Sequence, residues 1–389
     1  MRGLIQGDRL NVTYPNGVTR SYGPETGKTV GFHIHTRARL RAFCLNADLS
    51  LGEGIMDGTI TPVNCTHEDL LRVLVRSRET GRLPGWVRVL NRIRTSLWRL
   101  VHLNAPAAAR RNVAHHYDIS DEFYKLFLDA DMQYSCAYFA TPDMTLEEAQ
   151  IAKKAIIARK LRIEPGMHVL DIGCGWGGMA LTLAREYGAE VTGITLSENQ
   201  LATAQARAKA KGLEDRVRFQ LEDYRRVKGQ FDRIVSVGMF EHVGPRNYQT
   251  YFSKVADLLG PDGIALIHTI GASEAPKANP AWINKYIFPG GYIPSLSEIA
   301  PAIEKAQLWQ LDIEIWRLHY ARTLDHWITR FEQNLDTIRA MYDERFVTMF
   351  RYYLTICKIA FEEQPQAVYH LQLGHKVDAV PITRNYLYS

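Results

Sequence analysis

The stretch VLDIGCGWGG, residues 169–178, decides the fold. A short apolar run ends at Asp171, and Gly173, Gly175 and Gly177 follow at alternate positions. Glycine permits the positive φ of a sharp turn and lets the backbone approach a ligand closely. A strand that passes through such a turn into a helix is typical of nucleotide-like binding sites in open α/β sheets.

The segments around this turn alternate between strand-like and helix-like patterns. Repeated βα units with short connections predict an α/β fold with a doubly wound, mainly parallel sheet. A segment rich in proline and glycine, residues 273–296, interrupts the series. The expected strands are residues 168–173, 190–195, 217–222, 231–237, 263–270, 310–318 and 366–374, and the expected helices are 145–162, 177–187, 198–211, 246–259 and a long helical region at 321–363.

The N-terminal residues follow a different pattern. DRLNVTYPNGVTRSYG predicts a β-hairpin turning at Pro15-Asn16-Gly17, and GFHIHTRARLRAFCL predicts a strand followed by a helix. We therefore expect a small α+β domain at residues 1–85, a basic amphipathic helix or linker at 86–111, and a catalytic domain at 112–389.

Composition narrows the class of protein. A chain of 389 residues with 46% hydrophobic content can bury the cores of two domains. Its five cysteines are scattered with no CxxC pair, so neither a disulfide framework nor a metal site is expected. The N-terminus has no apolar signal-peptide region, and no run of 18 apolar residues occurs. A cytoplasmic protein is the simplest interpretation.

Positive charge is concentrated in one block. Ten arginines lie between Arg72 and Arg111, against one acid, Glu79. With Trp86 and Trp98 beside an apolar stripe, the block predicts an interfacial helix that docks on an anionic surface. The alternative is a helix packed on the catalytic domain with its arginines in solvent.

The glycine turn restricts the ligand. Its spacing is GxGxG, not the GxGxxG of dinucleotide-binding proteins, and no P-loop lysine follows. A cofactor of nucleoside size without phosphates fits better, and S-adenosylmethionine is the leading candidate; a purely structural turn is the alternative. Later strand ends supply neutral groups at Thr195, Ser197 and Gln200, and carboxylates at Glu222 and Asp223 that can accept from an adenine amino group. The two carboxylates could instead form a solvated strand end.

Seven motifs in order carry a family resemblance: HYDISDEFYKLFLDADMQYSCAYF, VLDIGCGWGG, GITLSENQ, VSVGMFEHVG, LIHTIG, WINKYIFPGGYIPS and HYARTLDHW. From about Asn112 to the C-terminus the chain resembles the cyclopropane-fatty-acid synthase family, which includes the mycolic acid cyclopropane synthases. The resemblance implies a class I methyltransferase fold and transfer of a methylene unit from S-adenosylmethionine to a cis double bond of an acyl chain. In the phospholipid-modifying branch it also implies an N-terminal lipid-binding domain.

The resemblance further implies the partners and the site residues. The partners would be membrane phospholipid with cis-unsaturated acyl chains and an anionic membrane surface, with peripheral membrane association and no nucleic acid; a homodimer is one option for the assembly. A bicarbonate ion would be held by Cys136, Glu241, His268, the backbone of Ile270, and Tyr320. The cofactor would contact Tyr134, Ser135, Leu170, Asp171, Gly173, Cys174, Gly175, Gly177, Thr195, Leu196, Ser197, Gln200, Glu222 and Asp223.

Other functions remain open at this level. The same family chemistry could end in a methyl branch or an exocyclic methylene instead of a ring. A nucleic-acid methyltransferase would suit the basic block, but enzymes that methylate exocyclic amines often carry Asn or Asp, two prolines and an aromatic where this chain has GMFEHVG. Intact Glu241, His268 and Tyr320 argue against a non-catalytic lipid carrier.

Overall fold

The structure is a computed structural model that describes residue 5 and residues 7–80 and 119–388. The expected basic helix or linker at 86–111, with Trp86 and Trp98, lies outside the described residues. The described chain forms two compact units, each built from separate parts of the sequence. The first unit contains the described residues up to 80 with 277–289 and 324–365, and the second contains 119–276, 290–323 and 366–388.

These units differ from the domain boundaries expected from the sequence. Residues 277–289 and 324–365 were expected within the catalytic domain, yet they cluster with the N-terminal module. The physical reason is that position along the chain does not determine which core an amphipathic helix joins. The boundaries at 85 and 111 fall among residues whose placement is not described, so they stay a prediction.

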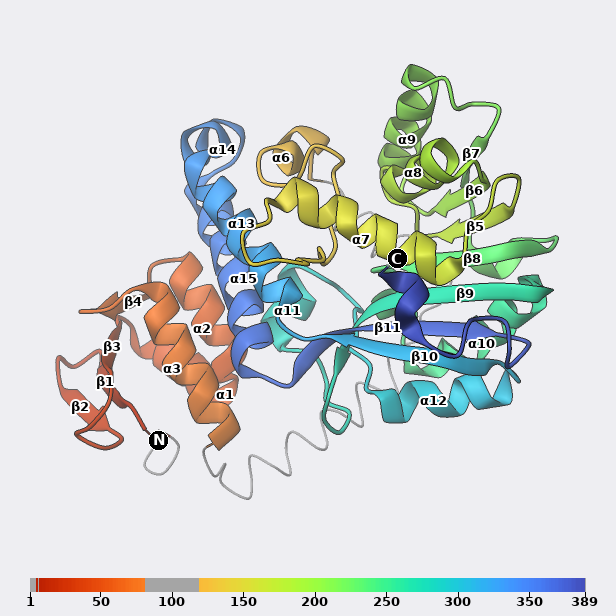
Figure 1. The fold of residues 1–389 in the computed structure, drawn as a ribbon. Helices are drawn as coiled ribbons and strands as arrows, with labels where there is room; N and C mark the ends of the chain where they lie inside the picture. Colours follow the sequence, from red (N-terminus) through yellow and green to blue (C-terminus); the bar gives the residue numbers. More distant parts are fainter. Residues whose placement is uncertain (1–4, 6, 81–118, 389) are drawn as a thin grey trace. The chain divides into compact units, whose positions relative to one another are not determined.

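The second unit contains a seven-stranded sheet in the order β10-β11-β9-β8-β5-β6-β7 (Figure 1). The five strands from β9 to β7 are parallel, and β11 and β10 are antiparallel to their neighbours. The α/β fold with a mainly parallel sheet is thus confirmed. The strands are β5 (His168–Ile172), β6 (Glu190–Thr195), β7 (Val217–Leu221), β8 (Phe231–Val237), β9 (Leu259–Ala272), β10 (Trp309–Trp316) and β11 (Gln366–Gly374).

The helices of this unit follow the strands as expected. A capping box formed by Thr145 and Glu148 fixes the start of α7, and Ser197 caps α9. Two helices, α6 and α12, were not predicted. The helices are α6 (Asp121–Lys125), α7 (Leu146–Leu161), α8 (Gly178–Tyr187), α9 (Glu198–Ala210), α10 (Tyr248–Leu258) and α12 (Leu296–Lys305), with the short 3-10 helices η1 (Tyr224–Arg226), η2 (Phe240–His242), η3 (Pro245–Asn247) and η4 (Arg384–Leu387).

Closely packed apolar side chains form the core around the glycine turn. Val191 of β6, Ala204 of α9 and Phe219 of β7 pack together with Leu183 of α8, and all four are buried. Such close contacts between helices and sheet hold the strand ends in fixed positions.

The first unit combines a four-stranded sheet, in the order β2-β1-β3-β4, with helices. The predicted hairpin pairs β1 with β2, and the predicted strand and helix at 31–45 are β3 and α1. The predicted helical region 321–363 is divided at Asn334 and at Asp343 into three helices. The elements are β1 (Arg9–Thr13), β2 (Thr19–Tyr22), β3 (Thr29–Ile34), β4 (Ile60–Val63), α1 (Arg37–Leu45), α2 (Ala47–Met56), α3 (His67–Thr80), α11 (Ala281–Tyr286), α13 (His319–Gln333), whose first turn belongs to the second unit, α14 (Leu335–Met341) and α15 (Glu344–Glu363).

Two arginines of the basic block belong to this unit. The Arg72 guanidinium lies 2.8 Å from Glu68, 2.7 Å from Glu362 and 2.9 Å from Glu363. Arg76 lies 2.6 Å from Glu363. Their charges are therefore paired within the unit, and docking of the basic block on an anionic surface stays a prediction. No helix among residues 7–80 and 119–388 has the length and apolarity needed to span a bilayer.

Candidate active site

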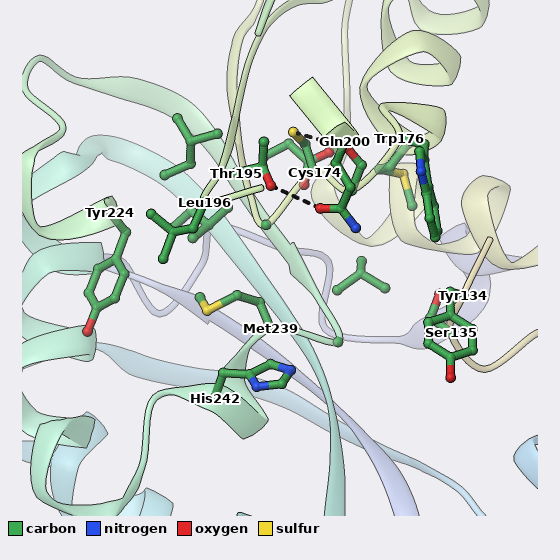
Figure 2. Close-up of a pocket in the computed structure, with 18 of the residues that line it drawn as sticks. Tyr134, Ser135, Cys174, Trp176, Thr195, Leu196, Gln200, Tyr224, Met239 and His242 are labelled. Carbon is green, nitrogen blue, oxygen red and sulfur yellow. Dashed lines mark hydrogen bonds between the residues drawn. The ribbon is translucent and has the colours of Figure 1, made fainter. Parts of the chain in front are cut away.

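A pocket with about 1140 Å³ of atom-free space, part of it open to solvent, lies at the carboxyl ends of β5, β6, β7 and β8. The strand order reverses between β5 and β8, which lie side by side in the sheet. Ligands of open α/β sheets bind at such a reversal, because the loops of the two neighbouring strands diverge there. Figure 2 shows the residues that surround this space.

The glycine turn forms one side of the pocket. Gly173, Gly175 and Gly177 have φ values of +84°, +54° and +83°. A Cβ on Gly173 would lie 2.8 Å from the Met239 side chain, and one on Gly177 would lie 2.6 Å from the Phe219 ring. A Cβ on Gly175 would meet nothing within 4 Å. Gly173 and Gly177 therefore serve close packing, whereas Gly175 leaves space for a ligand.

Asp171 is a buried acid in the pocket wall. It is 1% exposed, and its Oδ2 atom has no hydrogen-bond partner among the described residues. Burial raises the pKa of Asp171 to about 7, although the nearby Lys153 charge acts in the opposite direction. A buried oxygen without a donor is costly, so it is a good acceptor for a ligand group.

The start of α9, just after β6, supplies an amide donor, Gln200. The Thr195 hydroxyl lies 3.0 Å from the Gln200 side-chain oxygen, as the dashed line in Figure 2 marks. This bond orients the amide and leaves its NH₂ group to donate to a ligand. Ser197 does not line the pocket; its Oγ accepts from the Gln200 backbone N–H at 3.2 Å and caps α9.

The two acids after β7 differ in their surroundings. The Asp223 carboxylate accepts from the Arg225 Nε at 2.8 Å and from the Arg225 backbone N–H at 3.0 Å. Burial would raise the pKa of Asp223, but these Arg225 contacts outweigh it and lower the pKa. Glu222 accepts from the Asp223 backbone N–H at 2.9 Å through Oε1. Glu222 is thus the acid whose Oε2 atom is better placed to accept from a ligand amino group.

Lys153 is a pocket-supporting residue that sequence reasoning missed. Its side chain is fully buried, and its ammonium donates to Gln133 Oε1 and Ser135 Oγ, both at 2.8 Å. Gln150, also on α7, donates to the Ser135 carbonyl at 3.0 Å. Helix α7 therefore holds the segment that carries Tyr134 and Ser135 against the pocket, and burial lowers the pKa of Lys153 to about 7.

Other wall residues were also missed. Met239 and His242 come from the segment after β8, and Figure 2 shows both facing the pocket. Burial lowers the pKa of His242 to about 4, so this ring is neutral at pH 7. The position of His242 beside Glu241, directly after a strand, was the signal that could have identified it. The Trp176 ring is held by its Nε1–H, which donates to Asp121 at 2.8 Å.

Most of the predicted cofactor contacts lie in this pocket. Three do not line it: Leu170 is buried in the strand core, Gly177 is the N-cap of α8, and Ser197 is the N-cap of α9. The roles of the rest in binding stay a prediction. The predicted residues that line the pocket are Tyr134, Ser135, Asp171, Gly173, Cys174, Gly175, Thr195, Leu196, Gln200, Glu222 and Asp223.

Glu241 and Ile270 of the predicted anion site are in direct contact. Glu241 lies on η2, and its Oε1 atom accepts from the Ile270 backbone N–H at 2.6 Å. Its Oε2 atom is buried without a hydrogen-bond partner among the described residues. Burial raises the pKa of Glu241 to about 7, and the Ile270 N–H only partly opposes this shift.

The other predicted anion ligands lie on three segments. His268 is two residues before Ile270 on β9, so their side chains share a face of the sheet. Cys136 is fully buried, and burial raises the pKa of its thiol. The residue after it, Ala137, donates its N–H to Thr323 of α13 at 3.0 Å, and Tyr320 lies one turn earlier on that helix. Assembly of all five residues around one anion stays a prediction.

Comparison with known proteins gives the family. A family model described as mycolic acid cyclopropane synthetase matches residues 105–371. The chain belongs to this family. The match covers the glycine turn, the pocket and the Glu241–Ile270 contact, and it confirms the resemblance drawn from the motifs.

Individual members of the cyclopropane synthetase family extend the match. The chain is 41% identical to the cyclopropane-fatty-acyl-phospholipid synthase of Escherichia coli K12, over 85% of this chain and 84% of that protein. It is 46% identical to a probable fatty acid methyltransferase of Pseudomonas putida, over 64% of this chain but only 66% of that protein. The crystal structure of mycolic acid cyclopropane synthase CmaA1 with SAH and CTAB has a TM-score of 0.64 at 35% identity, over 68% of this chain and 97% of that chain.

Proposed function

We propose that this protein is a cyclopropane-fatty-acyl-phospholipid synthase that uses S-adenosylmethionine. The observation that carries the proposal is a pocket at the carboxyl ends of the parallel strands that is lined by a buried acid, Asp171. A second buried acid, Glu241, follows the neighbouring strand β8. The E. coli relative with this name matches 85% of the chain. This match to the E. coli protein is longer than the second compact unit alone. It therefore favours a phospholipid substrate over a substrate that only the second unit would recognise.

The pocket residues fit the cofactor chemically. The unpaired Asp171 Oδ2 would accept from a donor of the methionine portion, and the Gln200 amide would donate to a ribose hydroxyl. Glu222 would accept a hydrogen bond from the adenine amino group. The open space beside Gly175 would leave room for the cofactor. When bound, S-adenosylmethionine supplies an electrophilic methyl group.

The second half of the reaction needs a base, because a proton must leave the newly added methyl group when the ring closes. A bicarbonate ion, when bound, supplies that base. Glu241 has one oxygen fixed by the Ile270 N–H, so the other can accept from the protonated oxygen of the anion. His268 would donate to the opposite side, and Tyr320 and Cys136 would complete the site.

Burial makes the acidic and histidine side chains of the site suitable for a reaction that must exclude water. Asp171, Glu241 and His268 are each less than a tenth exposed, so water has little access to them. A cationic adduct of an alkene would be captured by water, so exclusion of solvent protects the ring-forming step. In a dry site each fixed dipole also acts more strongly on developing charge.

The experiment is a product analysis. Purified full-length protein is incubated with S-adenosylmethionine and vesicles of cis-unsaturated phospholipid, and the lipids are examined by mass spectrometry and proton NMR. We expect a mass gain of one CH₂ group per modified chain, loss of the alkene protons and appearance of cyclopropane protons. Persistence of the alkene signal with methylation of another acceptor would refute the proposal. A methyl-branched or methylene product would instead favour the fatty acid methyltransferase chemistry named for the P. putida relative.

A further inference from the structure

Three polar side chains form a row across the antiparallel part of the large sheet. His268 of β9 is directly opposite His370 of β11, and His370 is directly opposite Glu314 of β10. Residues directly opposite each other in a sheet project from the same face. Both histidines are at most 2% exposed, so the part of the row that adjoins the predicted anion site is buried.

Hydrogen bonds connect the row into a chain. His268 Nδ1 lies 2.8 Å from His370 Nε2, and His370 Nδ1 lies 3.3 Å from Lys160 Nζ of α7. Lys160 forms an ion pair with Glu314 and is 1% exposed in its side chain. The indole ring of Trp316 lies 3.9 Å from the His370 ring centre and packs edge-on against His268 at 5.6 Å. The two histidine rings are therefore held in place both by hydrogen bonds and by the Trp316 ring.

Lys160, at one end of this hydrogen-bonded row, determines which nitrogen of each histidine carries the proton. A lysine ammonium can only donate, so His370 Nδ1 must accept from Lys160. A neutral imidazole carries one N–H, and in His370 that proton is then on Nε2, from which it is donated to His268 Nδ1. His268 accepts at Nδ1, so its own proton must be on Nε2.

The charges around the row support neutral rings and a charged lysine. Burial lowers the pKa of His268, and the charges of Lys153 and Lys160 lower it further. Burial and Lys160 likewise lower the pKa of His370. Burial also lowers the pKa of Lys160, but the Glu314 carboxylate opposes that shift and keeps a counter-charge beside the ammonium.

We propose that His370, oriented by the Lys160–Glu314 pair, is a positioning residue that holds His268 in the Nε2–H form. This inference rests on the proposed function, in which His268 must donate to a bicarbonate ion rather than accept from it. The row thereby adds Lys160 of α7, Glu314 of β10 and His370 of β11 to the site. None of these three residues was predicted from the sequence to have a role in it. Nothing in the row needs to gain or lose a proton during turnover.

The direct test is the tautomer of each ring in the ligand-free full-length protein. Nitrogen-15 NMR of the histidine side chains distinguishes the nitrogen that carries a proton from the one that does not, and His268→Gln and His370→Gln spectra assign the signals. We expect the Nε2–H form in both rings. An Nδ1–H form or an imidazolium at His268 would overturn the proposal. In Lys160→Met we expect His370 to lose its single form, and an unchanged His370 would overturn the role of Lys160.

A matched pair of variants tests the consequence for catalysis. In His370→Gln the amide can still accept from Lys160 and donate to His268, whereas in His370→Met a side chain of similar length can do neither. If the two His268 tautomers become equally populated, kcat falls by about twofold, and by more if Nδ1–H dominates. We expect His370→Gln to retain more of kcat than His370→Met, with the KM for S-adenosylmethionine alike in both.

Equal kcat values in two equally folded variants would overturn the inference. Thermal unfolding of both variants controls for structural damage, because a general loss of packing would lower stability and kcat together. The proposed function is tested separately: if wild-type protein gives no product from cis-unsaturated phospholipid vesicles, that function fails. The tautomer measurement needs no substrate and still decides the role of His370.

Discussion

Replacing Asp171 with asparagine should stabilise the ligand-free protein while weakening cofactor binding. Burial raises the pKa of Asp171 from 3.8 to about 7. Each pKa unit corresponds to about 1.36 kcal/mol, so ionising Asp171 in the folded protein costs about 4 kcal/mol. Because the folded-state pKa lies above the unfolded-state value, the folded state binds more protons between about pH 4 and pH 7. The raised pKa of Asp171 therefore contributes most to the free energy of unfolding at low pH, and this contribution is lost as the pH rises through about 7.

Urea unfolding of ligand-free Asp171→Asn and wild type at pH 5 and pH 8 measures this effect. We expect the advantage of the variant to be larger at pH 8 than at pH 5 by about 2–3 kcal/mol. The exposed Asp257 of α10, changed to asparagine, is the matched control and should give no such difference. Calorimetry with S-adenosylhomocysteine should show affinity reduced about tenfold or more in Asp171→Asn, as expected for loss of a buried hydrogen bond. Parallel pH curves for the variant and wild type would refute the reasoning.

Four further substitutions test the site. Glu241→Gln should leave S-adenosylhomocysteine affinity nearly unchanged and lower kcat by about 10²-fold, and the rise of wild-type kcat through about pH 7 should disappear; a large loss of affinity would contradict the assigned role. Lys153→Met removes the donor to two pocket side chains and should weaken S-adenosylhomocysteine binding by about tenfold in calorimetry, so unchanged affinity in a folded variant would argue against that support. Gly173→Ala should destabilise the protein by about 1–3 kcal/mol in urea unfolding, because φ is +84° and the added Cβ would contact the Met239 side chain. Gly175→Ala has open space and should cost less stability but reduce ligand binding, and equal losses of stability would contradict this distinction.

Sequence patterns were sufficient to predict those features of the fold that depend on residues close together in the chain. The alternation of strands and helices from 145 to 270 predicted the parallel sheet, because periodicity shows which face of each element is buried. The glycine turn after Asp171 predicted the pocket, because carboxyl ends of parallel strands share one edge of the sheet. The single helical region expected at 321–363 was less accurate, since the breaks at Asn334 and Asp343 have no strong signal in the pattern.

The sequence by itself determined the fold class, the position of the pocket at the glycine turn and the residue types available for chemistry, because these follow from short-range spacing. Only the tertiary structure decided which polar side chains meet inside the protein. Lys153 and Lys160 look like solvent-facing lysines of an ordinary helix, yet one supports Ser135 and the other lies beside His370. A buried charge needs a partner from a distant segment, and strand register together with helix packing sets that partner, which spacing along the chain does not encode.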